Sequence, residues 1–239
     1  MGRALELCKD LVCLPYDFPA YERASRDFYE ILLSVRADAT QAVSVDEALL
    51  DVTSICTETV TPEHLAQSIR DRVRAKTGCE VSIGIGNNIL LAKLALRKAK
   101  PAGQYILKSE DAQEFMQHLD VQDLPGVGWK LSEKLEEVIG IKKVGDVRTK
   151  SLNELKEKLG LKTGEKLYDF ARGIDHTDVG EIVQRKSVSV EVTVPLSVIF
   201  WANGNIVGSK IRNSGTSRYF HAISCNRVII TVNQGRLYW

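Results

Sequence analysis

The sequence predicts an α+β fold in two parts, and three observations lead to this prediction. Up to about residue 119, segments with helical periodicity alternate with short apolar segments that are typical of strands. Two of these strands, AVSV and ALLDV, meet at Asp46-Glu47, which indicates an antiparallel hairpin. From about residue 120 to 174 the pattern is purely helical and is interrupted by glycines. We therefore expect a sheet with helices on one face, followed by a small all-α domain.

The first part divides into elements at recognisable start and stop signals. Residues 18–35 carry apolar side chains at helical spacing and predict an amphipathic helix. Thr61-Pro62 combines a capping threonine with a proline in the first turn, so a helix begins there and ends before Gly78. The other elements that we expect are a strand over residues 79–84, a helix over 89–99 between an asparagine cap and Lys100-Pro101, a strand over 104–107 and a helix over 109–119.

The second part contains short helices between glycine-containing turns. The segment LPGVG, residues 124–128, precedes an expected helix over 130–139, and GIKKVGD follows that helix. Further along, SVSVEVTV at residues 187–194 alternates like a strand. The last stretch, residues 196–239, contains the strand-like CNRVIITV but shows no clear organisation, so we leave it unassigned.

Composition narrows the class of protein. The chain is 44% hydrophobic and 26% charged, which is typical of a globular protein, and no apolar run is long enough to span a bilayer. The 5 cysteines are scattered and do not cluster with the 4 histidines, which argues against a disulfide framework and a zinc site. The net charge is only +1, but basic runs at residues 93–100, 130–150 and 185–186 would together suit phosphates.

Asp46 and Glu47 are the first candidates for chemistry. Adjacent acids on a regular strand point to opposite faces of the sheet, but at a tight hairpin both can reach the same ion. Carboxylates flanked by apolar strand residues are costly unless they are solvated, protonated or bound to metal, and Mg²⁺ is a common partner. A pair of surface acids is the competing interpretation. We interpret Asp51 as a hairpin or cap residue.

The segment Gly84-Ile85-Gly86 is similar to a dinucleotide-binding turn, but the pattern is incomplete. Ile89 stands where a third glycine is needed, and no suitable acid follows about 20 residues later. We therefore reject that interpretation in favour of a plain strand-to-helix turn. The helix would then project Lys93, Arg97 and Lys100 toward a phosphate site, since Lys93 and Arg97 lie one turn apart.

Gly126 and Gly128 form the third motif, together with Val127 between them and Lys130 in the helix that follows. Glycines let a backbone approach a phosphate closely, and the start of a helix offers free N–H donors. This is the design of a helix-hairpin-helix, which holds DNA through its phosphates and therefore reads no base sequence. An ordinary turn between two helices is the competing interpretation.

Taken together, the three motifs resemble the Y-family (UmuC/DinB-like) DNA polymerases. SVDEALLDVT is similar to the family's second metal-binding motif, SIGIGNNILLAKLALRKAKPAGQY to its strand-turn-helix, and DLPGVGWKLSEKLEEVIGIKKVGDV to its thumb hairpin. The segments VCLPYDFPAY, NILLA, RKAKP and GQY are nearest to the eukaryotic Rev-type deoxycytidyl transferase branch. The resemblance covers residues 3–194.

The resemblance implies roles for named residues. Asp46 and Glu47 would be two of three active-site carboxylates and would hold Mg²⁺, and Lys100 would contact the incoming triphosphate. The residues expected to contact DNA are Gly126, Val127, Gly128 and Lys130 in the thumb hairpin, and Arg185, Lys186 and Ser187 at the entry to a little-finger domain.

The implied function is template-directed nucleotidyl transfer on damaged DNA, which is translesion synthesis in DNA repair. The partners would be a DNA primer-template and a deoxynucleoside triphosphate, which is dCTP in the deoxycytidyl branch. Other translesion polymerases would be further partners. The resemblance implies a nuclear location.

Two departures from the family pattern suggest an incomplete copy. The first strand, with the first catalytic aspartate, and the fingers are missing, and after Pro195 the sequence no longer resembles the family. The missing strand would lie in the palm sheet. Its absence therefore predicts an unpaired strand edge, an exposed apolar face, poor stability and low polymerase activity.

The expected organisation has four segments. They are an incomplete ferredoxin-like palm at 1–119, a helix-hairpin-helix thumb at 120–175, a linker with the first little-finger strand at 176–195, and the unassigned tail at 196–239. The alternative function is a non-catalytic DNA-binding module that acts through the hairpin. A different helix-hairpin-helix repair enzyme, a glycosylase or a nuclease, would need a catalytic lysine and aspartate. Asp146 and Asp175, however, have contexts typical of loop and helix-end acids.

Overall fold

The computed structural model describes residues 2–12, 14–180 and 229–234. Its helices are α1 (Gly2–Leu7), α2 (Phe18–Leu33), α3 (Pro62–Thr77), α4 (Ile89–Ala99), α5 (Ser109–Gln117), the 3-10 turn η1 (Val121–Asp123), α6 (Trp129–Ile139), α7 (Val144–Arg148), α8 (Leu152–Leu159) and α9 (Leu161–Phe170). Its strands are β1 (Ala39–Ala42), β2 (Glu47–Asp51), β3 (Val81–Gly86), β4 (Gln104–Leu107) and β5 (Ile229–Gln234). Within these described ranges, no helix is both long and apolar enough to cross a membrane.

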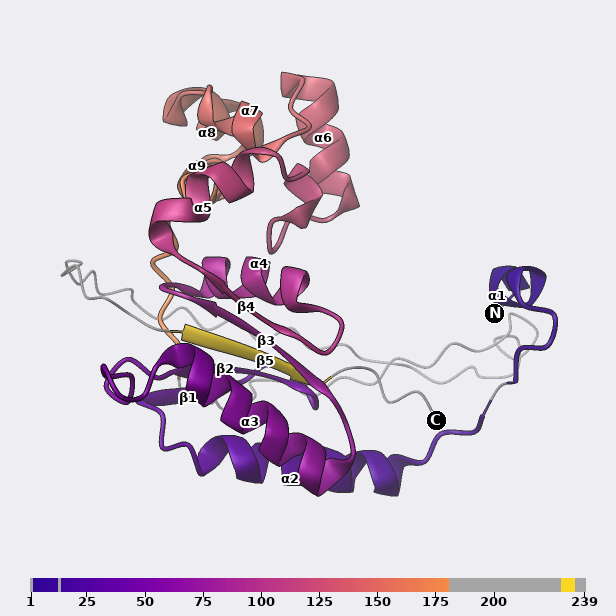
Figure 1. Cartoon of the computed structure of the whole chain (residues 1–239). Helices are drawn as coiled ribbons and strands as arrows, with labels where there is room; N and C mark the ends of the chain where they lie inside the picture. Colours follow the sequence, from indigo (N-terminus) through magenta and orange to yellow (C-terminus); the bar gives the residue numbers. More distant parts are fainter. Residues whose placement is uncertain (1, 13, 181–228, 235–239) are drawn as a thin grey trace, which may run out of the picture. The chain divides into compact units, whose positions relative to one another are not determined.

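A five-stranded sheet in the order β1-β2-β5-β3-β4 organises the first part of the chain (Figure 1). β1 and β2 form an antiparallel hairpin, as the sequence predicts, with Ala42 opposite Ala48 beside the turn. The expected first strand AVSV is wrong in its bounds, because β1 ends at Ala42 and residues 43–45 form the turn. β5 pairs antiparallel with β2 on one side and with β3 on the other, whereas β3 and β4 run parallel. The predicted α+β fold is confirmed.

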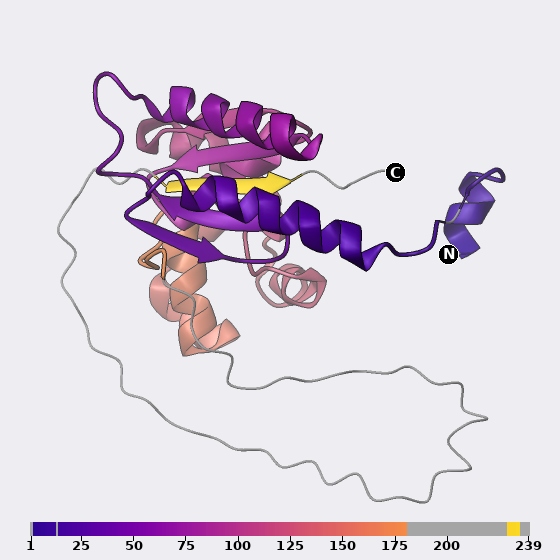
Figure 2. The ribbon, with the colours of Figure 1, turned by 90° about the horizontal axis from the view of Figure 1, so that it is seen from below.

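Strand β5 overturns the expectation of an unpaired strand edge. It fills the centre of the sheet, where residues 47–51 pair with one of its edges and residues 81–86 with the other. Figures 1 and 2 show it in yellow among strands from the first half of the chain. The tail that the sequence leaves unassigned therefore contributes a core strand. Periodicity predicts a strand in CNRVIITV, but it cannot give the pairing partners, which lie far away in the sequence.

Helices cover both faces of the sheet, whereas the sequence led us to expect helices on one face. α2 and α3 pack on the face that carries the buried side chains of Leu50, Ile83 and Val232. α4 covers the opposite face (Figure 1). The backbones come very close there, because a Cβ placed on Gly84 would lie 2.2 Å from the carbonyl oxygen of Ala92. This close packing fixes α4 relative to the start and end of β3.

The boundaries of α3 and α4 follow the predicted capping residues. The Oγ1 atom of Thr61 accepts a hydrogen bond from the N–H of His64 at 3.3 Å, and α3 ends at Gly78 with a left-handed φ of 72°. The Oδ1 atom of Asn88 accepts from the N–H of Leu91 at 2.8 Å at the start of α4. These local signals are sufficient to place both helices, since capping side chains satisfy N–H groups that have no partner inside the helix.

One hydrophobic cluster continues from α4 into the helices of the second part. Leu91 and Leu94 of α4 belong to the same buried cluster as Leu135 of α6 and Leu167 of α9. Two hydrogen bonds accompany this packing. The side-chain amide of Asn88 donates to the carbonyl oxygen of Gly173 at 2.8 Å, and Arg97 donates to the carbonyl oxygen of Asp123 at 2.8 Å.

Candidate active site and nucleic-acid interface

The carboxylate turn, defined as residues 43–47, links β1 to β2 and carries both predicted acids. Asp46 lies in the turn and Glu47 is the first residue of β2, and both are half-buried. The carbonyl oxygen of Glu47 accepts hydrogen bonds from the N–H groups of Val43 at 2.8 Å and Ser44 at 3.1 Å. The hydroxyl of Ser44 donates to the carboxylate of Asp46 at 2.5 Å. These hydrogen bonds hold the backbone of the turn, from which the two adjacent carboxylates extend.

Helix α2 holds the same turn from outside. The hydroxyl of Ser25 donates to the carbonyl oxygen of Val45 at 2.6 Å. One helical turn later, the hydroxyl of Tyr29 lies 2.5 Å from the carbonyl oxygen of Ser44 and 2.8 Å from that of Glu47. Neither Ser25 nor Tyr29 was expected from the sequence. The only signal was a pair of polar side chains with i, i+4 spacing on one face of the helix.

The negative charges of Asp46 and Glu47 act on the pKa of Tyr29. Burial raises the pKa of its phenol above the ordinary value, and the negative charges of Asp46 and Glu47 raise that pKa further. The phenol therefore keeps its proton and remains a hydrogen-bond donor to the turn. On the other side, the Nζ atom of Lys93 lies 3.8 Å from a carboxylate oxygen of Glu47, so α4 contributes a positive charge at the site.

The strand register brings Lys100 to the same end of the sheet. Glu47 is opposite Asn233 in β5, and Asn233 is opposite Ser82 in β3, so β2 and β3 begin at the same level. α4 runs back along β3 and ends at Ala99, next to that level. Lys100 follows it as an exposed residue and makes no ion pair within the described ranges. The topology therefore places the acids, Lys93 and Lys100 at one end.

The two carboxylates fit a divalent ion such as Mg²⁺. This ion is typically bound through one or two carboxylates and completes its shell with waters and substrate phosphates. Within residues 2–12, 14–180 and 229–234, no group of three or more His, Cys, Asp or Glu side chains is arranged for a metal. Asp51 does not join the pair, because its carboxylate accepts from the N–H and hydroxyl of Thr53 at 3.1 and 2.6 Å. It acts as a local cap, as the sequence suggests.

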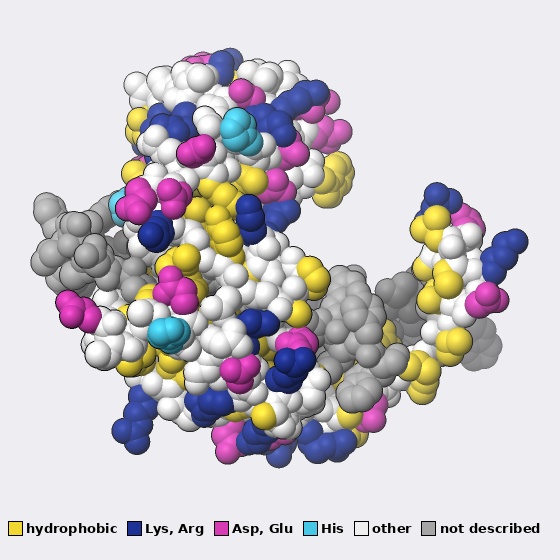
Figure 3. All heavy atoms as spheres, in the orientation of Figure 1, with side chains coloured by type: hydrophobic (Ala, Val, Ile, Leu, Met, Phe, Trp, Pro, Cys, Tyr) yellow, Lys and Arg dark blue, Asp and Glu magenta, His cyan; other side chains and the backbone are white. Residues whose placement is uncertain are grey.

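Several lysines and arginines of the predicted basic runs are already paired with acids. Arg97 forms an ion pair with Asp123 and so does not extend freely from α4. In the second run, the paired residues are Lys142 with Glu136, Lys143 with Asp120 and Lys150 with Glu154. On the face seen in Figure 3, positive and negative side chains are intermixed over the second part. Charge alone therefore does not mark out a phosphate-binding surface.

The hairpin loop, defined as residues 124–128, has the backbone geometry that the sequence predicts. Gly126 has a φ of +86°, a conformation that favours glycine. Gly128 is different, because its φ of −87° suits any residue and a Cβ there would meet nothing within 4 Å. It is the N-cap of α6, which leaves N–H groups of the first turn open. Among the described residues, packing does not require glycine at 128.

Residues beside the hairpin loop add cationic and aromatic groups. Trp129 at the start of α6 is 66% exposed, and the Nζ atom of Lys130 lies 5.4 Å from the centre of its ring. An exposed tryptophan next to a lysine offers a surface for stacking and for phosphate contact. Lys130 was expected from the sequence, whereas Trp129 was not.

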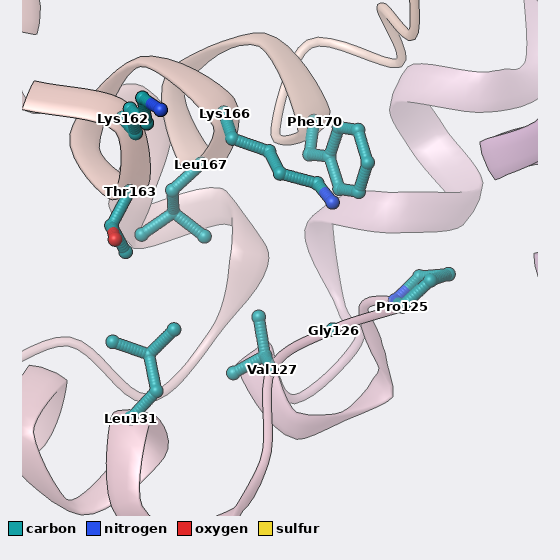
Figure 4. Close-up of a pocket in the computed structure, with 9 residues that line it drawn as sticks. All are labelled: Pro125, Gly126, Val127, Leu131, Lys162, Thr163, Lys166, Leu167 and Phe170. Atoms are coloured by element: carbon teal, nitrogen blue, oxygen red, sulfur yellow. The ribbon is translucent and has the colours of Figure 1, made fainter. Parts of the chain in front are cut away.

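A cavity of about 230 Å³ lies between the hairpin loop and α9 (Figure 4). It is lined by Pro125, Gly126, Val127, Leu131, Lys162, Thr163, Lys166, Leu167 and Phe170. The Nζ atom of Lys166 lies 4.8 Å from the ring centre of Phe170 and on the side of Gly126. Lys166 of α9 therefore lies beside the loop, which the sequence could not show because some 40 residues separate it from Gly126.

Asp146 and Asp175 have local structural roles. The carboxylate of Asp146 accepts from the N–H of Lys143 at 3.0 Å, and that of Asp175 accepts from the N–H of Thr177 at 3.0 Å. These are the helix-end and loop contacts that their sequence contexts indicate. Neither acid is arranged as the catalytic aspartate that a glycosylase or nuclease of this architecture would need.

Known protein families match both parts of the chain. Residues 1–97 match the impB/mucB/samB family, and residues 122–175 match the thumb domain of DNA polymerase-iota. The chain is 43% identical over 204 residues to the DNA repair protein rev1 of Schizosaccharomyces pombe, a match that covers 85% of the chain and 22% of that protein. It is 43% identical over 189 residues to the DNA repair protein REV1 of Arabidopsis thaliana, covering 79% of the chain and 17% of that protein.

Bacterial relatives and solved structures agree with these matches. DNA polymerase IV of Legionella pneumophila is 38% identical over 194 residues, or 81% of the chain and 54% of that protein. A Y-family DNA polymerase chimera superimposes with a TM-score of 0.67 at 30% identity, over 77% of the chain and 53% of that structure. DinB from Sulfolobus solfataricus gives a TM-score of 0.64 at 30% identity, over 74% of the chain and 52% of that structure. The chain thus spans about a fifth of the Rev1 proteins and about half of the others.

Proposed function

Because the chain belongs to the Y-family DNA polymerases, we propose that it forms the palm and thumb of a translesion DNA polymerase. The observation that supports this most is the carboxylate turn. Two half-buried acids lie together at the end of a sheet, and helices on both sides supply groups that hold and neutralise them. The proposed reaction is template-directed nucleotidyl transfer, with DNA and a deoxynucleoside triphosphate as substrates.

The proposed domains keep the boundaries expected from the sequence, with one addition. The palm spans residues 1–119 and gains β5 from the tail, and the helix-hairpin-helix thumb spans 120–175. Residues 176–195 are proposed to be a linker and the first little-finger strand. Of this segment, the buried Val179 packs with Leu49 of β2, and the rest beyond residue 180 lies outside the described residues.

Asp46 and Glu47 are proposed to hold Mg²⁺ in the palm. When bound, the ion would lower the pKa of the primer 3′-hydroxyl and offset charge on the triphosphate. The chain's own residues orient the carboxylate turn and screen its negative charge. Ser25 and Tyr29 hold the carboxylate turn in place, and Lys93 offsets part of the negative charge of Glu47. Lys100, at the same end of the sheet, is proposed to contact the triphosphate.

The thumb is proposed to hold DNA by its phosphates. Gly126, Val127 and Gly128 would let the backbone approach a phosphate, and the N–H groups at the start of α6 would donate to it. Lys130 would add a positive charge next to the exposed ring of Trp129. Arg185, Lys186 and Ser187 are proposed to contact the template backbone, and they lie outside the described residues.

The substrates, partners and location are also proposals. The relatives from Schizosaccharomyces pombe and Arabidopsis thaliana are named DNA repair proteins. These names support a nuclear role in DNA synthesis on damaged templates. One similar structure is titled an insertion ternary complex of Dbh DNA polymerase, which supports a DNA primer-template and a nucleotide as joint ligands. dCTP as the nucleotide, and other translesion polymerases as partners, are proposed only from the sequence resemblance to the deoxycytidyl branch, and the arginine that selects dC in that branch is not among the residues that resemble it.

Fluorescence anisotropy with a labelled primer-template tests the proposed function. We expect dCTP to tighten DNA binding only when Mg²⁺ is present, and Asp46→Asn to abolish this tightening while the basal DNA affinity is unchanged. Asp51→Asn, which removes an acid with a local role, should behave like the original chain. A DNA affinity that does not depend on Mg²⁺, on dCTP or on Asp46 would contradict the proposal and favour the non-catalytic DNA-binding module.

A further inference from the structure

We propose that the gap between β2 and β3 is a strand-acceptor site, and that residues 229–234 are a separable strand that occupies it. The partner that fits this site is an extended segment with apolar residues on both faces, running antiparallel to both neighbours. In this chain the occupant is its own C-terminal strand, β5. The inference concerns how the sheet is completed and does not depend on the proposed polymerase activity.

All of the strand pairing between the two halves of the described sheet passes through β5. Residues 47–51 of β2 pair with it on one edge, and residues 81–86 of β3 pair with it on the other. β2 otherwise pairs with β1, and β3 with β4, and within the described chain β2 and β3 are not neighbours. Removal of β5 would therefore leave two separate pairs of strands, each with a new row of unpaired backbone groups.

The strand contributes to the core on both faces of the sheet. Ile230 and Val232 are fully buried against α2 and α3, in the cluster that contains Leu50 and Ile83. Ile229 is buried on the face toward α4. Side chains that alternate in this way are what a central strand needs. A polar or short segment in the same gap would leave cavities on both faces.

One residue of β5 fits the site poorly. Thr231 is fully buried between Leu49 and Gly84, and its hydroxyl has no hydrogen-bond partner among the described residues. A buried hydroxyl without a partner opposes folding, and a valine of the same shape would not carry this cost. The gap is therefore shaped for an apolar, β-branched side chain at this position, and the present occupant is not the best possible one.

The covalent connection to β5 is long in sequence. Residues 181–228, called the tether, connect it to the rest of the described chain. The entropic advantage of an intramolecular strand falls as the number of connecting residues increases. A free peptide of the same sequence is therefore a suitable competitor for the tethered strand.

The test separates β5 from the rest of the chain by cutting the tether. A protease site is inserted between residues 181 and 228, the folded protein is cut, and amide hydrogen exchange is measured at β2 and β3. We expect protection to persist after cutting, with the C-terminal fragment retained on gel filtration. An isotopically labelled peptide of residues 226–239 should then replace the fragment, and the same peptide with Thr231→Val should replace it at several-fold lower concentration.

Truncated chains provide the matched controls. A chain that ends at residue 228 should lose protection in β3 and regain it with the peptide, whereas a chain that ends at residue 234 should stay protected without it. Protection of β3 in the chain that ends at 228, or release of the fragment on cutting without any change in protection, would overturn the inference. Failure of the labelled peptide to enter the cut protein would overturn it equally. None of these results depends on metal, nucleotide or DNA, so they are independent of the proposed function.

Discussion

The carboxylate turn and the hairpin loop are the two regions proposed to act on DNA, and they are built in opposite ways. The turn is held by α2, by α4 and through β2 by the distant strand β5. In the hairpin loop, a local hydrogen bond runs from the N–H of Val127 to the carbonyl oxygen of Leu124 at 3.0 Å, and the side chain of Leu124 is buried in the cluster that contains Leu167 of α9. The backbone conformation of the thumb loop is therefore set locally to a greater extent than that of the carboxylate turn.

Glycine substitutions should give the largest difference between the two regions in the free energy of unfolding. Gly84→Ala places a Cβ 2.2 Å from backbone atoms of Ala92 and Leu96, so α4 must move away from the sheet. We expect a loss of ~3 kcal/mol or more in the free energy of unfolding, measured by denaturant titration. Gly128→Ala, where a Cβ meets nothing within 4 Å, should change the free energy by less than ~0.5 kcal/mol. Similar losses in the free energy of unfolding for Gly84→Ala and Gly128→Ala would contradict this difference between the two regions.

Removal of the Tyr29 hydroxyl should weaken the palm site with a smaller effect on stability. Tyr29→Phe keeps the ring against Phe28 but removes the donor to the carbonyl oxygens of Ser44 and Glu47. We expect a loss of ~1 kcal/mol in stability and about a tenfold weaker Mn²⁺ affinity, measured by electron paramagnetic resonance. Tyr21→Phe on the same helix is the matched control. An unchanged Mn²⁺ affinity in Tyr29→Phe would mean that α2 does not position the acids.

The same hydroxyl should give the palm a specific pH dependence. Burial and the two nearby acids raise the pKa of Tyr29 in the folded chain. The folded state then holds the phenol proton more tightly than the unfolded state, so this contribution is complete below pH ~10 and is lost as the pH rises through the folded pKa. Stability curves of the original chain and of Tyr29→Phe should therefore converge above pH ~10. Parallel curves through that range would contradict the assignment.

The smallest expected effect is at Lys130. Lys130→Ala should leave the free energy of unfolding unchanged, because the side chain is exposed and lies against the exposed Trp129 ring. DNA affinity should fall about fivefold, and the slope of log affinity against log salt should decrease by about 1. Lys142→Ala, where the lysine is paired with Glu136, is the control and should have less effect. Equal losses of DNA affinity for the two substitutions would show that DNA does not bind preferentially at the hairpin side of the thumb.

The sequence predicts the backbone conformation of the hairpin loop because this conformation is determined locally. Gly126 is required by its own φ of +86°, and the helix that follows begins next to the predicted residue. The caps Thr61 and Asn88 are equally local and place α3 and α4 correctly. A residue's own conformation and its neighbours within one turn are sufficient for these assignments.

The palm could be predicted only in part because its determinants lie far apart. The sequence indicates Asp46 and Glu47, but it does not show that Ser25 and Tyr29 hold their turn. It suggests a strand in CNRVIITV, but it does not show that the strand pairs with both β2 and β3. Alternation defines which residues of a strand share a face and leaves open which strands become its neighbours.

The most direct test of the palm site is a map of paramagnetic broadening by Mn²⁺ on the full chain. Backbone amide signals of an isotopically labelled sample are recorded as Mn²⁺ is added, with the Asp46→Asn, Glu47→Gln double variant as the control. We expect signals of residues 43–47 and of Lys93 to broaden first, and this broadening to disappear in the double variant. Broadening that begins elsewhere, or that persists without the two carboxylates, would contradict the assignment of the palm as the catalytic metal site.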